Sequence, residues 1–312
     1  MSTPFLNALR RGASALVALA ACLLAPPGAH AASVQLCDRS SDTTAAQKDV
    51  LLQFGALVKG ELAAGDADVA LIARSGVDLH RFGARYSHEG VALKDSANGP
   101  WSVRQLYYAC DERKPRIFDQ GMAGFLFGTD DPEHGWVSLV FLPPADAAPL
   151  HAAALDDARA VRVLGATYSA NAYPFSTRYE NCNQWVMELL AGAWGDLDPA
   201  AADARAQAQA WLHDAGYEPH TFEVPAHALV WAVEFFSLLH NDDHPVANLA
   251  DDRYVVSMPS SVEGFVRARV PGAKRIEICH AGRRVVVHRG WDEIAEGCVP
   301  GDGDGVIELV AG

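Results

Sequence analysis

Strand-type sequence patterns occur in two blocks, one before and one after a helix-type middle, and this arrangement restricts the possible folds more than any other feature. The first block holds four runs, at residues 68–74, 86–93, 101–110 and 136–144. In the third run Val103, Gln105 and Tyr107 alternate with the residues between them, after the turn-prone segment DSANGP. The second block is a hairpin-type run at 275–291, turning at HAGR, and a run at 306–310.

Helix-type periodicity predicts five helices outside these blocks. They cover residues 43–64, 146–159, 182–192, 198–216 and 226–240, the last strongly apolar and opening after Pro225. The sequence therefore predicts an α+β fold, an antiparallel sheet packed on helices. We expect one domain over residues 32–312, with a helical insert at about 198–242 and a β-rich tail at about 253–312.

The first 31 residues have the three parts of an export signal. Arg10 and Arg11 precede the short apolar core GASALVALAACLLA, which ends at PPGAHA. Cleavage after Ala31 would give a periplasmic or secreted protein, and the alternative is an uncleaved N-terminal anchor. Later runs are too short for a transmembrane helix, which needs about 18 to 20 apolar residues.

The chain is acidic, and this excludes one class of partner. It has 25 Lys and Arg residues against 39 Asp and Glu, a formal net charge of −14, which becomes −16 once Arg10 and Arg11 are lost with the signal. Because an acidic surface repels phosphate, nucleic acid is not expected as a partner.

Five cysteines remain after Cys22 leaves with the signal peptide. In an oxidising compartment an odd number leaves at least one thiol without an intramolecular partner. We predict disulfides Cys37–Cys110 and Cys279–Cys298, the second across the predicted hairpin, although four cysteines allow three pairings. Cys182 is then the free thiol.

Cys182 stands where a polar segment turns into an apolar helix-type run. Unpaired N–H groups and the positive end of the helix dipole favour the thiolate at this position. A nucleophilic thiol needs a base, and His88 lies midway along a strand-type run, followed by Gly90. The alternatives are a buried structural thiol and a core histidine with its hydrogen bonds satisfied.

Two motifs resemble a known enzyme group. NCNQWVMELL around Cys182 resembles the Asn-Cys-Glu-His-Phe segment of lecithin retinol acyltransferase-like enzymes, and YSHEGVAL around His88 resembles their His-x-Gly-Ile-x-Leu strand. Both belong to the circularly permuted NlpC-type papain-like superfamily, in which the histidine strand precedes the cysteine helix, as it does here. The resemblance implies a permuted papain-like fold with Cys182 as nucleophile and His88 as base.

A longer pattern resembles a secreted proteobacterial family known only as a domain of unknown function. It includes ALIARSGVDLHRFGARYSHEG, YENCNQWVMELLA, SMPSSVEGFVRARVP and HRGW, and covers most of the chain after the signal.

The superfamily's third residue is a polar side chain on the strand after the histidine. Gln105 is the best match, with Asn98 and Asp95 in the preceding turn. Many relatives carry histidine or a carboxylate there, whereas glutamine could orient the ring without adding charge. The alternative is that Gln105 faces solvent.

Further polar residues flank the predicted site. Asn181 and Asn183 could donate to an oxyanion or cap the helix. Tyr86 and Tyr179, together with Tyr173, could line the cleft.

These residues predict an exported cysteine hydrolase or acyltransferase that acts on an amide, ester or thioester through an acyl-enzyme. By resemblance, the substrate would be a peptide, a protein or an acyl group. The alternative is an exported binding or assembly protein that keeps the fold without turnover. No cofactor is expected. HNDDH at 240–244 lacks a known metal-ligand spacing, and GDGDG at 301–305 lacks the further acids of a calcium loop, so no metal is expected either.

Overall fold

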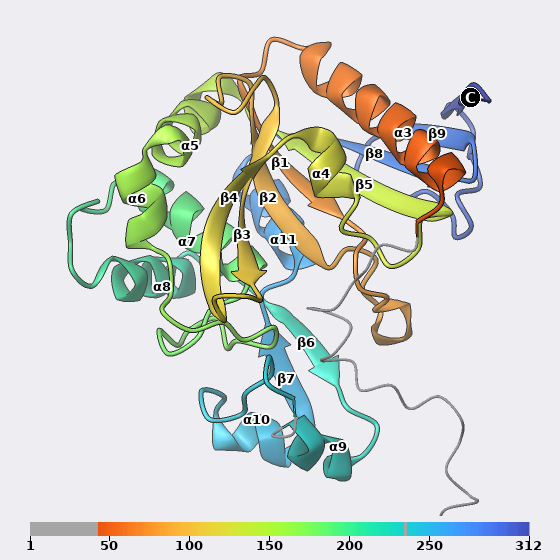
Figure 1. The fold of residues 1–312 in the computed structure, drawn as a ribbon. Coiled ribbons are helices and arrows are strands. Elements are labelled where there is room, and N and C mark those ends of the chain that lie inside the picture. Colours follow the sequence, from red (N-terminus) through yellow and green to blue (C-terminus); the bar gives the residue numbers. More distant parts are fainter. Residues whose placement is uncertain (1–42, 234–235, 312) are drawn as a thin grey trace, which may run out of the picture. The chain divides into compact units, whose positions relative to one another are not determined.

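An antiparallel sheet of eight strands forms the framework of the protein (Figure 1). The computed structural model describes residues 43–233 and 236–311, so the predicted signal peptide and Cys37 lie outside the described residues. The strand order is β10-β9-β8-β5-β1-β2-β3-β4, and every neighbouring pair is antiparallel. The strands are β1 (Val69–Arg74), β2 (His88–Leu93), β3 (Ser102–Ala109), β4 (Lys114–Gln120), β5 (His134–Phe141), β8 (Lys274–Ala281), β9 (Arg284–Arg289) and β10 (Gly305–Glu308).

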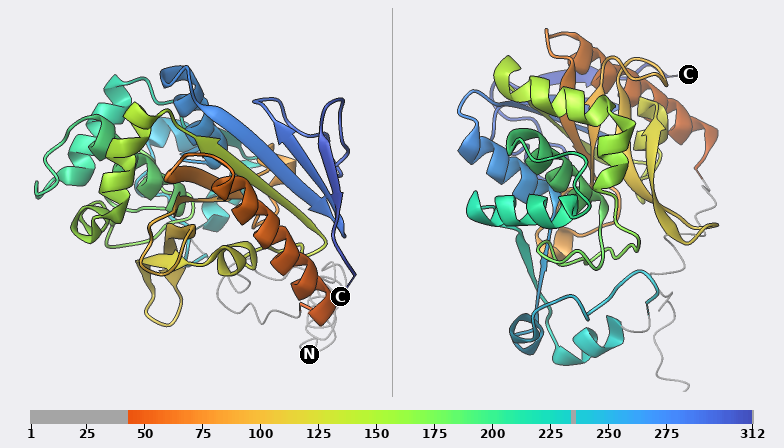
Figure 2. Two further views of the ribbon diagram at one scale, coloured as in Figure 1. Left: turned by 90° about the horizontal axis from the view of Figure 1, so that it is seen from above. Right: turned by 90° about the vertical axis from the view of Figure 1, so that its left-hand side faces the viewer.

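Helices cover both faces of this sheet (Figure 2). They are α3 (Ala45–Ala63), α4 (Met122–Leu126), α5 (Pro144–Leu155), α6 (Asp157–Arg162), α7 (Cys182–Trp194), α8 (Ala204–Asp214) and α11 (Pro259–Arg269). The predicted α+β fold with an antiparallel sheet packed on helices is therefore confirmed.

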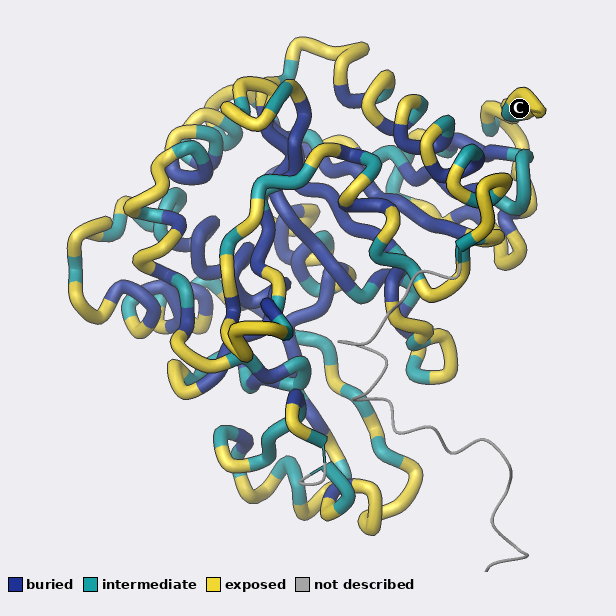
Figure 3. The backbone as a smooth tube through the Cα atoms, viewed as in Figure 1, coloured by how far each residue is buried: buried dark blue, intermediate teal, exposed yellow. Residues whose placement is uncertain are grey.

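Alternation along the strands divides the interior into two cores. In β2, Val91 and Leu93 pack with α5, α7, α8 and α11, whereas Ala92 packs with α3 and α4. The apolar stripe predicted for the first helix, which includes Phe54 and Val58, lies in this second core. Burial is nearly continuous along the central strands (Figure 3).

A two-stranded sheet, β6 (His220–Glu223) and β7 (Arg253–Val256), carries the short helices α9 (His227–Ala232) and α10 (Val246–Ala250). The predicted helical insert thus contains a strand. The prediction of one apolar helix at 226–240 is wrong, because α9 ends at Ala232. Val230 is its one buried residue, while Leu229 is 48% and Trp231 65% exposed, so packing does not stabilise a longer helix.

Three other boundaries differ from the prediction. The tail predicted to be β-rich, at about 253–312, contains the helix α11, which begins at Pro259 and buries Val262, Phe265 and Val266. The predicted helix at 146–159 breaks at Asp156, whose carboxylate accepts from two N–H groups and caps α6. The helix that begins at Cys182 passes the predicted stop at 192 and ends at Trp194.

The disulfide Cys279–Cys298 is formed, with an S–S distance of 2.02 Å, as predicted. Cys110 is also disulfide-bonded, but its predicted partner Cys37 falls outside the described residues. Cys182 is the free cysteine of the described chain. Within residues 43–233 and 236–311, none of the helices has the length and apolar character needed to cross a membrane.

Candidate active site

The pairing of β2 with β3 stops before it reaches His88 on β2 and Gln105 on β3. The ladder runs from Leu93–Ser102 to Val91–Arg104, while β2 continues to His88 alongside β1 and β3 continues alongside β4. Gly90 lies tightly against β3 at this point. A Cβ added there would lie 2.6 Å from Val103 Cγ1 and 2.9 Å from the Arg104 carbonyl oxygen, so a larger side chain would displace the strand.

Cys182 is the first residue of α7 and is held there by a helix cap. Asn181 has an extended backbone, and its Oδ1 accepts from the Gln184 N–H at 2.8 Å. Asn181 therefore acts as the N-cap, one of the two roles expected for it. The face of α7 that includes Trp185 and Leu189 is buried in the core and anchors the helix against β2 and β3.

The thiol lies beside the backbone of β2. The N–H groups of Glu89 and Asn183 hydrogen-bond to the Cys182 sulfur, and the Arg74 guanidinium adds a favourable positive charge. Burial outweighs these effects and raises the pKa of the Cys182 thiol to about 12. The sequence-based expectation of a lowered thiol pKa is therefore wrong for this structure, because the side chain is only 6% exposed.

Asn183 does not point its amide N–H₂ at an oxyanion position. Its Nδ2 donates to the Ser257 carbonyl at 3.0 Å, and its Oδ1 accepts from the Cys182 Sγ–H at 3.4 Å. Asn183 thus ties the start of α7 to the segment that follows β7.

His88 is the first residue of β2 and is 7% exposed. Its Nε2 lies 2.5 Å from Gln105 Oε1, and its ring packs against the rings of Tyr107 and Phe125, with centroids 5.7 and 5.8 Å away. Burial and, second, the positive charge of Arg74 lower the pKa of His88 to about 3, against the opposing effect of the hydrogen bond that His88 donates to Gln105. The imidazole is neutral at neutral pH.

Gln105 is 1% exposed, so the solvent-facing alternative is wrong. Its Nε2 donates to Gln120 Oε1 at 2.5 Å, which continues the chain of side chains that begins at His88. The other two candidates for this position contact different groups: Asn98 donates to the Asp119 carbonyl, and Asp95 lies 3.6 Å from His151.

Cys182 and His88 approach the end of β2 from different sides. Cys182 belongs to the core that contains Val91, whereas the alternation of the strand directs His88 and Gly90 to the opposite face. The Cys182 sulfur accepts a hydrogen bond from the N–H of Glu89, the residue that follows His88. The positive charge of Arg74 lowers the pKa of both the Cys182 thiol and the His88 imidazole.

Two of the three tyrosines expected in the cleft contact other groups. The Tyr86 hydroxyl donates to Glu277 and accepts from Arg275 Nη2, within a buried ionic cluster. Tyr179 stacks on His240 with ring centroids 4.2 Å apart.

Tyr168 is a residue that sequence reasoning missed. Burial raises the pKa of Tyr168 well above its usual value, with smaller electrostatic contributions from Cys182 and Tyr107. Its ring packs on Tyr108 at 5.4 Å. Arg74 was missed as well. The clustered tyrosines of WSVRQLYYAC were the available signal for this aromatic surface, whereas no local pattern distinguished Arg74.

The segment that leads into Cys182 is fixed by Arg205 of α8. Arg205 pairs with buried Glu188 (Nε to Oε2, 2.7 Å), and it donates to the carbonyl oxygens of Thr177 and Tyr179 at 2.8 and 3.0 Å. The predicted insert thus has a structural function, because its first helix holds the segment that precedes Cys182.

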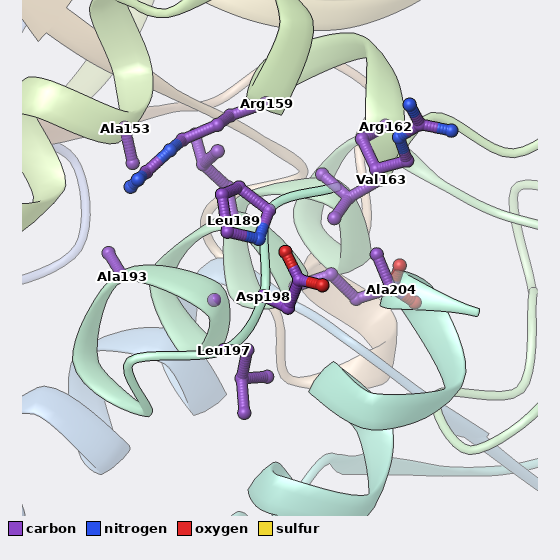
Figure 4. A pocket seen from close by; sticks show the side chains of 12 residues that line it. Ala153, Arg159, Arg162, Val163, Leu189, Ala193, Leu197, Asp198 and Ala204 are labelled. Atoms are coloured by element: carbon purple, nitrogen blue, oxygen red, sulfur yellow. The ribbon is translucent and has the colours of Figure 1, made fainter. Parts of the chain in front are cut away.

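A small cavity lies at the other end of α7 (Figure 4). It is lined by Glu188, Leu189 and Ala193 together with residues of α5, α6 and the segment before α8, and its volume of about 30 Å³ suits a single water molecule. It is separate from the Cys182 site and too small for a substrate. Over the described ranges, no three His, Cys, Asp or Glu side chains are grouped so that they could hold a metal ion.

Comparison with known proteins gives a family for the chain. No curated protein and no solved structure matches the sequence or the fold. The family described as "Uncharacterized protein conserved in bacteria (DUF2145)" matches residues 61–266, which include both His88 and Cys182. The chain belongs to this bacterial family, DUF2145.

Proposed function

We propose that the protein is an exported cysteine-dependent hydrolase or acyltransferase acting on an amide, ester or thioester. The observation that carries the proposal is the position of the free thiol. Cys182 begins α7, and its sulfur accepts a hydrogen bond from the N–H of Glu89, the residue after His88. Gln105 in turn orients the His88 ring. A thiol, a base and a group that orients the base are the parts of a cysteine nucleophile site.

The reaction starts from a neutral thiol and a neutral imidazole. As the Cys182 sulfur bonds to the substrate carbonyl carbon, His88 takes the thiol proton. The N–H of Cys182 itself, at the start of α7, donates to the resulting oxyanion, because the N–H groups of Asn183 and Gln184 already bind the Cys182 sulfur and the Asn181 cap. His88 then gives its proton to the leaving nitrogen, oxygen or sulfur as that bond breaks, which leaves a thioester on Cys182.

The second half returns the enzyme to its starting state. Water or another acceptor attacks the thioester carbonyl while His88 takes the acceptor's proton, and the carbon–sulfur bond breaks with return of the proton to sulfur. The positive charge of Arg74 favours the thiolate in both halves, because it lowers the pKa of Cys182.

The permuted papain-like relationship is part of this proposal. It is supported by the chain order of the His88 strand and the Cys182 helix, and by the packing of α7 on an antiparallel sheet. The superfamily resemblance makes a peptide, a protein amide or an acyl group the substrate class. The Cys279–Cys298 disulfide is compatible with a periplasmic or secreted protein.

A cysteine-directed electrophile with a peptide-like leaving group, such as an acyloxymethyl ketone, tests the proposal. We expect one adduct per chain, located at Cys182 by peptide mapping, and none in Cys182→Ser. Failure of a panel of such ketones to label the folded protein, with labelling only after denaturation, would count against an enzyme.

A second candidate is a binding or assembly protein without turnover. The observation that favours it is α9, which presents Leu229 and Trp231 to solvent. In this case Leu229→Ser with Trp231→Ser would abolish the cellular function of the protein, while Cys182→Ser would leave it intact.

A further inference from the structure

Gln120, the last residue of β4, continues the hydrogen-bonded chain behind His88. Gln105 Nε2 donates to Gln120 Oε1 at 2.5 Å, and Gln105 Oε1 lies 2.5 Å from His88 Nε2. A side-chain amide has one acceptor end and one donor end, so its two neighbours determine which end faces which. While Gln120 presents its oxygen, Gln105 must present its own oxygen to the imidazole.

This orientation decides where the imidazole proton lies. A carbonyl oxygen can only accept, so His88 Nε2 must carry the hydrogen and His88 Nδ1 keeps its lone pair. We propose that Gln120 is a positioning residue that holds His88 in the Nε2–H tautomer and thereby leaves Nδ1 as the atom that takes the Cys182 proton. The last part rests on the proposed function, whereas the tautomer does not.

The end of β4 is firmly placed for this task. Asp119, the neighbour of Gln120, accepts from Arg104 Nε and Nη2 at 2.7 and 2.6 Å, a bidentate pair between β3 and β4. Asn98 also donates to the Asp119 carbonyl at 2.8 Å, and Gln120 itself pairs with Val103 in the ladder. The backbone at Gln120 is thus held by strand pairing, which places its side chain beside Gln105.

The tautomer matters because His88 is uncharged. A protonated ring would carry hydrogens on both nitrogens, whereas burial keeps this one neutral at neutral pH, with a pKa of about 3. If the Gln105 amide turned over, its Nε2 would face His88 Nε2 and force the hydrogen onto Nδ1. The base would then have no lone pair on the nitrogen that serves Cys182.

Two substitutions at Gln120 separate this role from simple packing. Gln120→Glu keeps an acceptor toward Gln105 Nε2 and should preserve the Nε2–H tautomer. Gln120→Leu removes the acceptor, releases the Gln105 amide and should give a mixture of tautomers or the Nδ1–H form. Gln207→Leu on α8 makes the same chemical change at a glutamine whose amide donates to Asp203, away from the His88 chain, and serves as the matched control.

Nitrogen-15 NMR of histidine-labelled protein at neutral pH measures the tautomer, with the His88 signals assigned by their loss in His88→Asn. We expect the Nε2–H form in the wild type, Gln120→Glu and Gln207→Leu, and loss of that form in Gln120→Leu. An Nδ1–H tautomer in the wild type, or an unchanged tautomer in folded Gln120→Leu, would overturn the inference.

The rate of Cys182 acylation by p-nitrophenyl acetate is a separate readout. It should fall at least about tenfold in Gln120→Leu and be retained in Gln120→Glu, since a wrong tautomer disables a histidine base. If the tautomer behaves as expected but Cys182 is never acylated, the positioning of His88 stands and the proposed function fails. If Gln120→Leu does not fold, the wild-type tautomer and the Gln120→Glu result still decide the inference.

Discussion

His88 Nε2 lies 2.5 Å from Gln105 Oε1, just beyond the point where β2 and β3 stop pairing. Because Gln105 is uncharged, it can orient the imidazole but offers little to an imidazolium, in contrast to a carboxylate partner. At neutral pH the Cys182 thiol and the His88 imidazole are therefore both uncharged. Proton transfer is then expected to accompany attack on a carbonyl rather than to precede it.

The first prediction concerns the resting thiol. Since the pKa of Cys182 is raised to about 12, alkylation by iodoacetamide should be slow at neutral pH and should still be rising at pH 10. Denatured protein should instead level off above the ordinary thiol pKa of about 8.5. Rapid labelling of the folded protein at pH 6 would mean that the thiolate forms without substrate.

The second prediction concerns Glu89, which is buried beside the nucleophile with no hydrogen-bond partner for its Oε2. Burial raises the pKa of Glu89 well above its usual value, with a smaller contribution from Glu263. An unfolded chain ionises this carboxyl above about pH 4.3, whereas the folded chain keeps it protonated, so stability is lost as pH rises above that value.

Glu89→Gln removes this titration. The free energy of unfolding of Glu89→Gln, relative to that of the wild type, should therefore be larger at pH 8 than at pH 4, by at least about 1.4 kcal/mol, the equivalent of one pKa unit. Urea unfolding at the two pH values measures the difference. An equal effect of the substitution at both values would show that Glu89 titrates normally.

The third prediction concerns the Cys279–Cys298 disulfide, which joins β8 to the segment between β9 and β10 across 19 residues. Replacing both cysteines by serine should lower the free energy of unfolding by about 3 kcal/mol. Replacing both cysteines avoids a new free thiol. Dithiothreitol should then lower the melting temperature of the double variant less than that of the wild type, because this disulfide is no longer there to be reduced. Wild-type stability in the double variant would show that the bond is dispensable.

The fourth prediction concerns Arg205, which neutralises Glu188 and holds the segment before Cys182. Arg205→Met should destabilise the protein by about 3 to 5 kcal/mol, because it leaves a buried carboxylate without its partner. Adding Glu188→Gln should recover part of this loss in urea unfolding. If the two changes were simply additive, Arg205 and Glu188 would not act as a pair.

Elements with a clear local pattern were predicted from the sequence. The helix with Phe54 and Val58, the strand that begins at His88 and the hairpin that carries Cys279 all have strong periodicity or turn signals. The contact between His88 and Gln105 followed from the family resemblance, which places them on successive strands.

Features that depend on the tertiary structure were not predicted. β4 is an edge strand with Pro115 near its start, and most of its residues are exposed or half-buried. Its sequence therefore lacks the alternation of apolar and polar residues that marks a strand, and Gln120 at its end was missed with it. Arg74 reaches the site only through the pairing of β1 with β2. The thiol pKa was misjudged because the cost of burying Cys182 exceeds the local effect of the helix start.

Acylation by p-nitrophenyl acetate tests whether Cys182 is a nucleophile that uses His88 as its base. We expect a burst of nitrophenol equal to one acyl group per chain, with the acetyl group found on Cys182 by peptide mass. The burst should be absent in Cys182→Ser and slower by about 100-fold or more in His88→Ala, since a positioned base contributes about 10² to 10⁴ in rate. Acylation of Cys182 at the same rate in folded His88→Ala, or only after the protein is unfolded, would show that His88 is not a base for Cys182 in the native protein.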